Sequence, residues 1–189
     1  MKDRLPPMDP AGMSEAQRKA AAELIAGPRK AVIGPFIPLL RSPELMDRMQ
    51  RVGEYLRFGT SVPAKLNELA ILVTARHVTN QFEWVVHHPH AIKAGVAPTA
   101  LDALARGERP RGLPDDEAVV VDFCRELLST HQVRDETFAR AVALLGEQGV
   151  VDLMGTVGYF FAICVMMNAA GTPPPKSEVP LLQPLAAAR

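Results

Sequence analysis

The chain has 189 residues, with 21 basic and 21 acidic side chains and a formal net charge of zero; 48% of its residues are apolar and 22% are charged. These values are typical of one soluble globular domain with a substantial buried core. No block of Lys or Arg stands apart, which argues against a nucleic-acid partner because such binding needs clustered cations.

The sequence gives no sign of a membrane or secretory protein. The first residues contain no apolar core of signal-peptide length, and the longest apolar run, Val157–Ala170, is shorter than the roughly 20 residues that a membrane-spanning helix needs. Cys124 and Cys164 lie in apolar stretches and form neither a CxxC pair nor a metal-type cluster. We therefore expect a cytoplasmic protein without a membrane partner, its two thiols being buried and reduced.

Proline and glycine residues divide the chain into three parts. Residues 1–13 contain three prolines and one glycine and are expected to be a mobile N-terminal lead-in. Residues 14–170 are expected to form a single domain. Residues 171–189 are rich in proline and are expected to form a tail that wraps a surface.

The first helix is predicted over about Glu15–Ile25, because Ser14 and Gln17 form a capping-box pattern. Two prolines interrupt the apolar stretch 34–40, which favours an extended segment or short turn over a helix. The next helix is predicted from Pro43, at its first position, to about Gly59.

Two strongly apolar helices follow. One starts at Pro63 and is apolar over most of its circumference, which predicts burial on several sides. The other runs from about Asn80 to Ala94, with a kink or a new start expected at Pro89.

The second half of the chain continues with helices joined by short turns. These helices are predicted over Pro98–Ala105, Pro114 to about His131, Asp135–Gly146, and Gly149 or Val150 to Ala169. No segment alternates apolar and polar residues with the period of a strand. The sequence therefore predicts an all-α fold.

One group of titratable residues lies within the two apolar helices. Glu83 and His87 are four residues apart and share a helix face, with His90 three residues further on. A carboxylate beside an imidazole raises the imidazole's basicity and sets its tautomer, and the pair can pass a proton. If Glu68 of the preceding helix faces the same gap, three titratable groups converge.

Two other interpretations compete with this one. A Glu–His pair at this spacing is often only a solvated pair on a helix surface. A metal site is the other alternative, but His87, His88 and His90 do not have the spacing of a zinc-binding His pair and no HExxH is present. We expect no metal and no cofactor.

The stretch from about Leu66 to Leu104 resembles the carboxymuconolactone decarboxylase family, which includes the alkylhydroperoxidase-D-like (AhpD-like) proteins. The resemblance rests on three segments: Asn67–Leu72, Phe82–His87 and Ala91–Val96. It implies an all-α domain with a central antiparallel helical hairpin. It also implies a homo-oligomer, a trimer or hexamer, with sites near subunit interfaces.

The resemblance also identifies what the chain lacks. In the redox branch of the family, the hairpin carries a CxxC between a Glu and a His of a proton relay. Here the relay residues fall on Glu68 and His87, and the cysteine positions fall on Asn80 and Glu83. The loss of both thiols argues against dithiol peroxidase chemistry, which needs an attacking thiolate and a resolving thiol.

The non-redox side of the family implies a cofactor-independent carboxy-lyase acting on a small unsaturated lactone or carboxylate. His87, oriented by Glu83, would donate the proton, and Glu68 would be a second acid or base. Arg76 or Arg57 would supply a cation for the substrate, Trp84 an apolar wall, and His90 a flanking contact.

The residues alone leave open whether the chain is an enzyme. The first alternative is a non-catalytic oligomeric binding protein in which the polar cluster specifies packing. The second is a peroxidase-related antioxidant protein that has lost the CxxC and uses Cys124 or Cys164.

Overall fold

The computed structural model describes residues 2–185, and within this range it contains helices and no strand. The prediction of an all-α fold is confirmed. A short 3-10 turn, η1 (Pro10–Gly12), comes before eight α-helices. They are α1 (Glu15–Ala26), α2 (Phe36–Leu39), α3 (Pro43–Phe58), α4 (Ala64–His77), α5 (Gln81–Lys93), α6 (Pro98–Ala105), α7 (Asp115–Thr130) and α8 (Asp135–Ala170).

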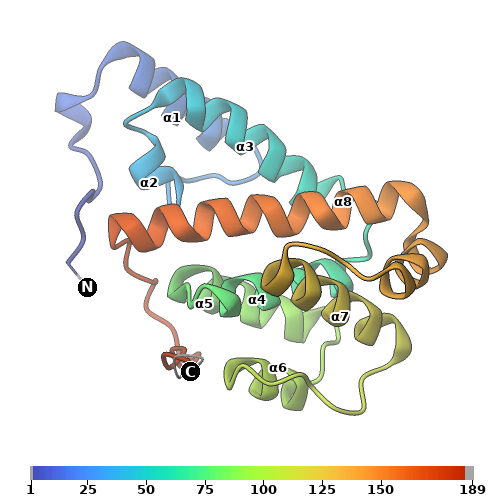
Figure 1. Cartoon of the computed structure of the whole chain (residues 1–189). Coiled ribbons are helices and arrows are strands. Elements are labelled where there is room, and N and C mark those ends of the chain that lie inside the picture. The colour runs from blue at the N-terminus through green and yellow to red at the C-terminus, as the bar shows by residue number, and fades with distance from the viewer. Residues whose placement is uncertain (1, 186–189) are drawn as a thin grey trace.

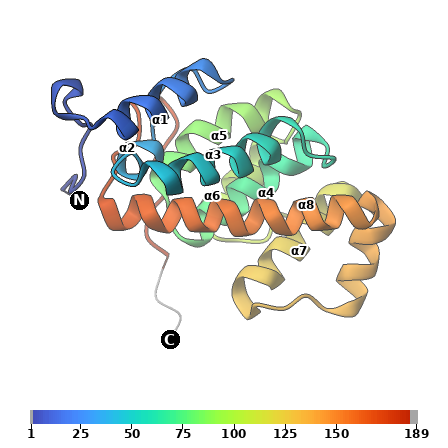
Figure 2. The same ribbon diagram turned by 90° about the horizontal axis from the view of Figure 1, so that it is seen from above.

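The long helix α8 lies between two groups of helices (Figure 1). On one side α1, α2 and α3 pack together, and on the other side lie α4, α5, α6 and α7 (Figure 1). Seen from above, α5 and α7 lie on opposite sides of α8 (Figure 2). Helix α8 contacts α2 and α3 from the first group and α4, α5 and α7 from the second. Apolar residues on several of its faces are therefore buried.

Helices α4 and α5 form the hairpin at the centre of the second group. They are joined by residues 78–80 and pack closely along each other. Helix α4 also contacts α6, α7 and α8, so its residues from Leu69 to Arg76 are buried without interruption. Asn80 caps α5, because its side-chain oxygen accepts a hydrogen bond from the Glu83 backbone N–H at 2.9 Å.

Two local predictions differ from the structure. Residues 36–39 form a one-turn helix, α2, although prolines flank and interrupt this stretch. The turn forms because Pro38 lies in its first turn, where a backbone N–H has no helical partner to lose. Helix α5 continues through Pro89 without a new start, although a new start is one of the two outcomes that the sequence predicts there.

The break predicted in the last part of the chain is present inside α8. Gly146 has φ 71° and ψ 172°, which interrupts the helical backbone between the two predicted helices. The apolar run Val157–Ala170 is only the end of this longer helix. By length and composition α8 would be able to cross a membrane, but 56% of its most apolar window is buried within the protein, as in the core helix of a globular domain.

Both ends of the described chain contact the domain. The backbone N–H of Arg4 donates to the carbonyl of Ala170 at the end of α8 at 2.7 Å. In the C-terminal segment, Leu182 is buried in the main core and exchanges two hydrogen bonds with the Gln81 side chain. The tail therefore covers the start of α5.

Asp152 of α8 ties the α3–α4 connection to the core. Its carboxylate, which is 6% exposed, accepts hydrogen bonds from the hydroxyls of Tyr55, Thr60 and Ser61 and from the Ser61 backbone N–H. Burial alone would raise the pKa of Asp152, but these hydrogen bonds together hold it below its ordinary value. The connection that leads into α4 is therefore anchored at one carboxylate.

Replacing Asp152 by Ala should lower the free energy of unfolding by about 2–3 kcal/mol, because a charged acceptor of several hydrogen bonds is lost. Urea unfolding measures this change. Asp47→Ala, which removes an acid from the surface ion pair with Arg51 on α3, should have little effect.

The sign of the pH dependence also follows. Since the folded-state pKa of Asp152 is lowered, its stabilisation is complete above about pH 4 and is lost as the pH falls through the lowered pKa. The difference in stability between the wild type and Asp152→Ala should shrink over that range. Equal urea midpoints at pH 7 would contradict the anchoring role.

Candidate functional site

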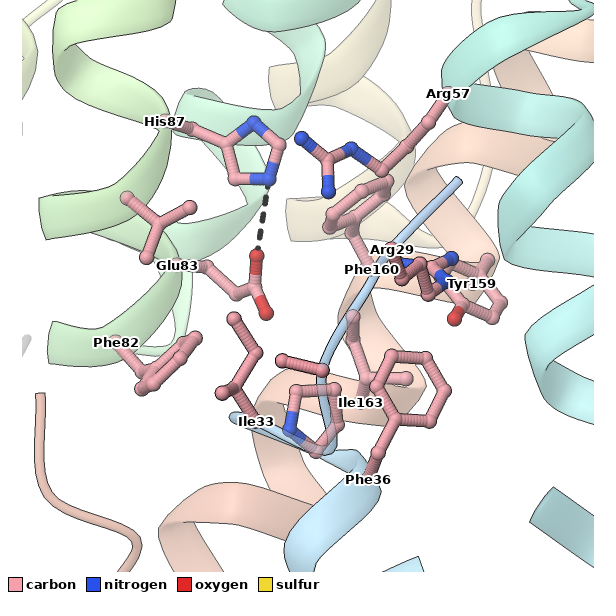
Figure 3. Close-up of a pocket in the computed structure, with 13 residues that line it drawn as sticks. Arg29, Ile33, Phe36, Arg57, Phe82, Glu83, His87, Tyr159, Phe160 and Ile163 are labelled. Atoms are coloured by element: carbon pink, nitrogen blue, oxygen red, sulfur yellow. Dashed lines mark ion pairs between the residues drawn. The ribbon is translucent and has the colours of Figure 1, made fainter. Parts of the chain in front are cut away.

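The hairpin brings Glu68, Glu83 and His87 into direct contact. Nδ1 of His87 on α5 lies 2.6 Å from Oε2 of Glu68 on α4. Nε2 of the same ring lies 3.1 Å from Oε2 of Glu83, one helical turn earlier on α5, and Figure 3 marks this ion pair. Both ring nitrogens therefore face a carboxylate oxygen.

These three groups differ in their access to solvent. The side chains of His87 and Glu83 are 1% and 5% exposed, whereas that of Glu68 is 17% exposed. The line from Glu68 through His87 to Glu83 thus runs from the partly exposed side of the hairpin to its interior. The ring of Phe160 on α8 packs edge-on against His87 with centroids 5.3 Å apart.

The electrostatics of the cluster favour the imidazolium form of His87. Burial by itself lowers the pKa of His87, but the hydrogen bonds to Glu68 and Glu83 and their negative charges act against it. The balance raises the pKa above its ordinary value. A protonated ring between two acceptors can release a proton on one side and regain it on the other.

A cavity with about 510 Å³ of empty space, part of it open to solvent, lies beside Glu83 and His87. Its walls come from the α1–α2 connection, α2, α3, α5 and α8 (Figure 3). Apolar side chains dominate the lining: Ala31, Ile33, Pro35, Phe36, Phe82, Val86, Phe160 and Ile163. Glu68 does not line the cavity, so it reaches the cavity only through His87.

The remaining lining residues are Arg29, Arg57 and Tyr159. Figure 3 shows the guanidinium of Arg57 reaching from α3 toward the His87 ring. The guanidinium of Arg29 stacks over the ring of Phe36, 4.6 Å from its centroid. Burial lowers the pKa of Arg29 and raises that of Tyr159 to about 12, so the phenol is neutral.

Sequence reasoning named Arg57 but not Arg29 or Tyr159. Arg29 follows a Gly-Pro turn and belongs to no motif, and Tyr159 is one of many apolar or aromatic residues on α8. No local sequence pattern marks either residue as part of a site. Their position depends on how the α1–α2 connection and α8 pack against α5.

The three residues predicted to contact substrate do not line this cavity. Trp84 is 2% exposed in the main core, where its ring lies edge-on to His88. Arg76 is buried at the end of α4 and donates to the carbonyl of Gln183 at 2.7 Å. His90 is exposed on α5, with its ring centroid 6.0 Å from that of His87.

Neither cysteine is near solvent. Cys124 and Cys164 are both 0% exposed and unpaired, and burial raises the pKa of each thiol. A raised pKa disfavours the thiolate that attacks peroxides. Among the residues that the structure describes, no group of three or more His, Cys, Asp or Glu side chains is arranged to hold a metal ion.

One comparison with known proteins matches the part of the chain that contains this cluster. Residues 43–118, from α3 to the start of α7, match the model of the carboxymuconolactone decarboxylase family. Glu68, Glu83, His87 and Arg57 lie inside the matched stretch, and Arg29 and Tyr159 lie outside it. None of the curated proteins matches the chain.

The imidazole of His87 should titrate above about pH 6.5, the ordinary value for histidine, and should carry a proton on both nitrogens at pH 6. Two-dimensional ¹H–¹⁵N spectra of the imidazole nitrogens measure this. His88 is the matched control. Burial lowers its pKa, so His88 should titrate below about pH 6.5.

The stability should follow the same titration. Because the folded-state pKa of His87 is raised, its stabilisation is complete below about pH 6.5 and is lost as the pH rises through the raised pKa. A His87 ring that is neutral at pH 6 would contradict the assignment of the imidazolium.

Proposed function

We propose, on the premise of the match between residues 43–118 and the carboxymuconolactone decarboxylase family, that the chain is a cofactor-independent carboxy-lyase. Its substrate is a small unsaturated lactone or carboxylate, and its reaction depends on proton transfer. The observation that carries the proposal is the contact line Glu68–His87–Glu83, which connects the partly exposed side of the hairpin to a mostly apolar cavity.

The reaction needs one bond to break and one to form. The bond between carbon and the leaving carboxylate breaks, CO2 departs, and the electron pair moves into the conjugated carbonyl to give an enolate. A proton then adds to carbon, so that R–COO⁻ and H⁺ become R–H and CO2. The residues must stabilise the enolate and supply the proton.

The Glu83–His87 pair supplies the proton at the cavity wall. His87 holds it on Nε2, 3.1 Å from Glu83 Oε2. Glu68 restores the proton to Nδ1 from the solvent side, because its side chain is partly exposed and lies 2.6 Å from that nitrogen. Arg57 reaches toward this part of the cavity and supplies a cation for the substrate. The imidazolium of His87 stabilises the negative charge of the enolate.

Replacing His87 by Ala should lower turnover by about 10²–10⁴-fold, the usual contribution of a positioned acid or base. Glu83→Gln should have a similar effect, and Glu68→Gln a smaller one that grows with pH. The assay is CO2 release and deuterium incorporation in D2O, with carboxymuconolactone and a panel of small unsaturated lactone acids as substrates.

His88→Ala is the matched control, since His88 is on the same helix but does not line the cavity. Circular dichroism and light scattering should show unchanged helicity and assembly in each variant. Full turnover in His87→Ala would refute the proposed mechanism.

A second candidate function is assembly without catalysis, with the buried polar cluster specifying the packing. It is favoured by one observation: Val151, Met154, Phe161 and Val165 of α8 are apolar and exposed. Together with Gly158 they follow spacings of three and four residues, the pattern of a helix–helix seam. We propose that this face joins copies of the chain into a homo-oligomer.

Phe161→Asp should shift the protein toward monomers, because it buries a charge in the seam. Light scattering coupled to gel filtration measures the mass. Ile25→Asp on α1 is the control at an exposed apolar site away from the seam. If the function is assembly, His87→Ala should also lower the stability of the protein or dissociate the oligomer. An unchanged melting temperature and an unchanged mass in this variant would count against the assembly function.

A further inference from the structure

We infer that Arg29, Arg57 and Tyr159 form a subsite that binds one carboxylate of the ligand, the carboxylate that the proposed reaction leaves in place. This inference rests on the proposed function, because it concerns the same cavity and names the substrate group held there. The first observation behind it is a group of buried polar atoms at this end of the cavity.

Within residues 2–185, three buried polar atoms at one end of the cavity form no well-aligned hydrogen bond: Nε and Nη2 of Arg29 and the hydroxyl oxygen of Tyr159. The two side chains are close enough for the Arg29 guanidinium to act against the rise in the pKa of Tyr159 that burial causes. Buried polar groups are almost always paired, because an unsatisfied one costs about 1–3 kcal/mol. Such a cost is tolerated where a ligand supplies the missing partner.

The two side chains meet at one place. Both lie against Gly53 of α3, where a Cβ atom would overlap the Tyr159 hydroxyl and come within 2.7 Å of Arg29 Nη2. The absence of a side chain at Gly53 therefore allows both polar groups to sit there together. Packing of the Arg29 guanidinium over Phe36 holds it in this position.

Arg57 adds a second cation. Within residues 2–185 it makes no hydrogen bond or ion pair, and its only recorded partner is the ring of Phe58, 5.1 Å from the guanidinium carbon. The surface arginines Arg48 and Arg51 on the same helix both pair with acids. The two arginines that line the cavity are thus available to an anion, and planar guanidinium groups suit a carboxylate.

The charge balance fits one carboxylate bound at this subsite. The lining carries two cations, Arg29 and Arg57, and one carboxylate, Glu83; the imidazolium of His87 is balanced by Glu68 behind it. The lining is therefore positive by about one charge. One ligand carboxylate neutralises it, and the apolar lining suits the rest of the ligand.

If the substrate of the proposed lyase has two carboxylates, this arrangement assigns a different place to each of them. The carboxylate bound by the arginines is stabilised and stays in the product. The carboxylate that leaves lies against Glu83 and apolar side chains, with no cation left to balance it. Its departure as CO2 moves that charge into the conjugated carbonyl, where it is delocalised and is then neutralised when the proton adds to carbon, and this favours the reaction.

The test is binding, measured without turnover. The probe is 2-furoate, a five-membered ring with one carboxylate, titrated into the wild type by calorimetry, with methyl 2-furoate as the neutral analogue. The wild type should bind the acid and not the ester. Arg29→Gln and Arg57→Gln should each weaken binding by about 10–100-fold, as expected for a lost charge-assisted hydrogen bond.

Tyr159→Phe separates a ligand role from a structural one. It removes only the unpartnered hydroxyl, so the melting temperature should stay the same or rise while affinity for 2-furoate falls severalfold. Arg51→Gln, a surface change on α3, should bind like the wild type. Furan-2,5-dicarboxylate should bind no more tightly than 2-furoate.

The inference is overturned if the wild type does not bind 2-furoate, if the ester binds equally well, or if Arg29→Gln and Arg57→Gln bind like the wild type. Arginine-dependent binding without turnover of any substrate would thus refute the proposed function and leave the subsite standing. Turnover that needs His87 but not Arg29 would support the proposed function and refute the subsite.

Discussion

The structure depends on the burial of one imidazole between two carboxylates. A charged ring in the interior is stable only if its charge is paired and its nitrogens are hydrogen-bonded. Glu68 of α4 meets Nδ1 of His87 and Glu83 of α5 lies near Nε2, so α4 and α5 must pack in the register that brings both acids to the ring. Phe160 of α8 then covers it. The packing of the hairpin and the chemistry of the site are therefore set by the same three side chains.

Local periodicity explains which parts of the site could be foreseen. Glu83 and His87 share a face because they are four residues apart, and the short connection to α4 brings Glu68 opposite them. The same geometry turns Trp84 away, since one residue along a helix rotates a side chain by about 100°. The sequence argument put Trp84 at the site because of its neighbours, whereas the structure has it in the core.

The cationic end of the cavity could not be foreseen because it joins distant parts of the chain. Arg29 comes from the α1–α2 connection and Tyr159 from α8, and both lie outside the stretch that matches the family. Their meeting depends on tertiary packing around Gly53, which no local pattern encodes. The residues proposed to transfer the proton thus lie within the matched stretch, while most of the residues that line the cavity lie outside it.

Asn80 sets this chain apart from the redox proteins that it resembles. At this position, where that branch carries a cysteine, Asn80 caps α5 and donates to the Cys164 carbonyl at 3.1 Å and to the Asn168 side chain at 2.8 Å. A return to cysteine here would remove the cap and leave a carbonyl of α8 without this donor, and a cysteine in place of Glu83 would leave His87 with one acid. A thiol pair at these two positions would therefore cost the hairpin a helix cap, a buried hydrogen-bond donor and one of the two acids that contact His87.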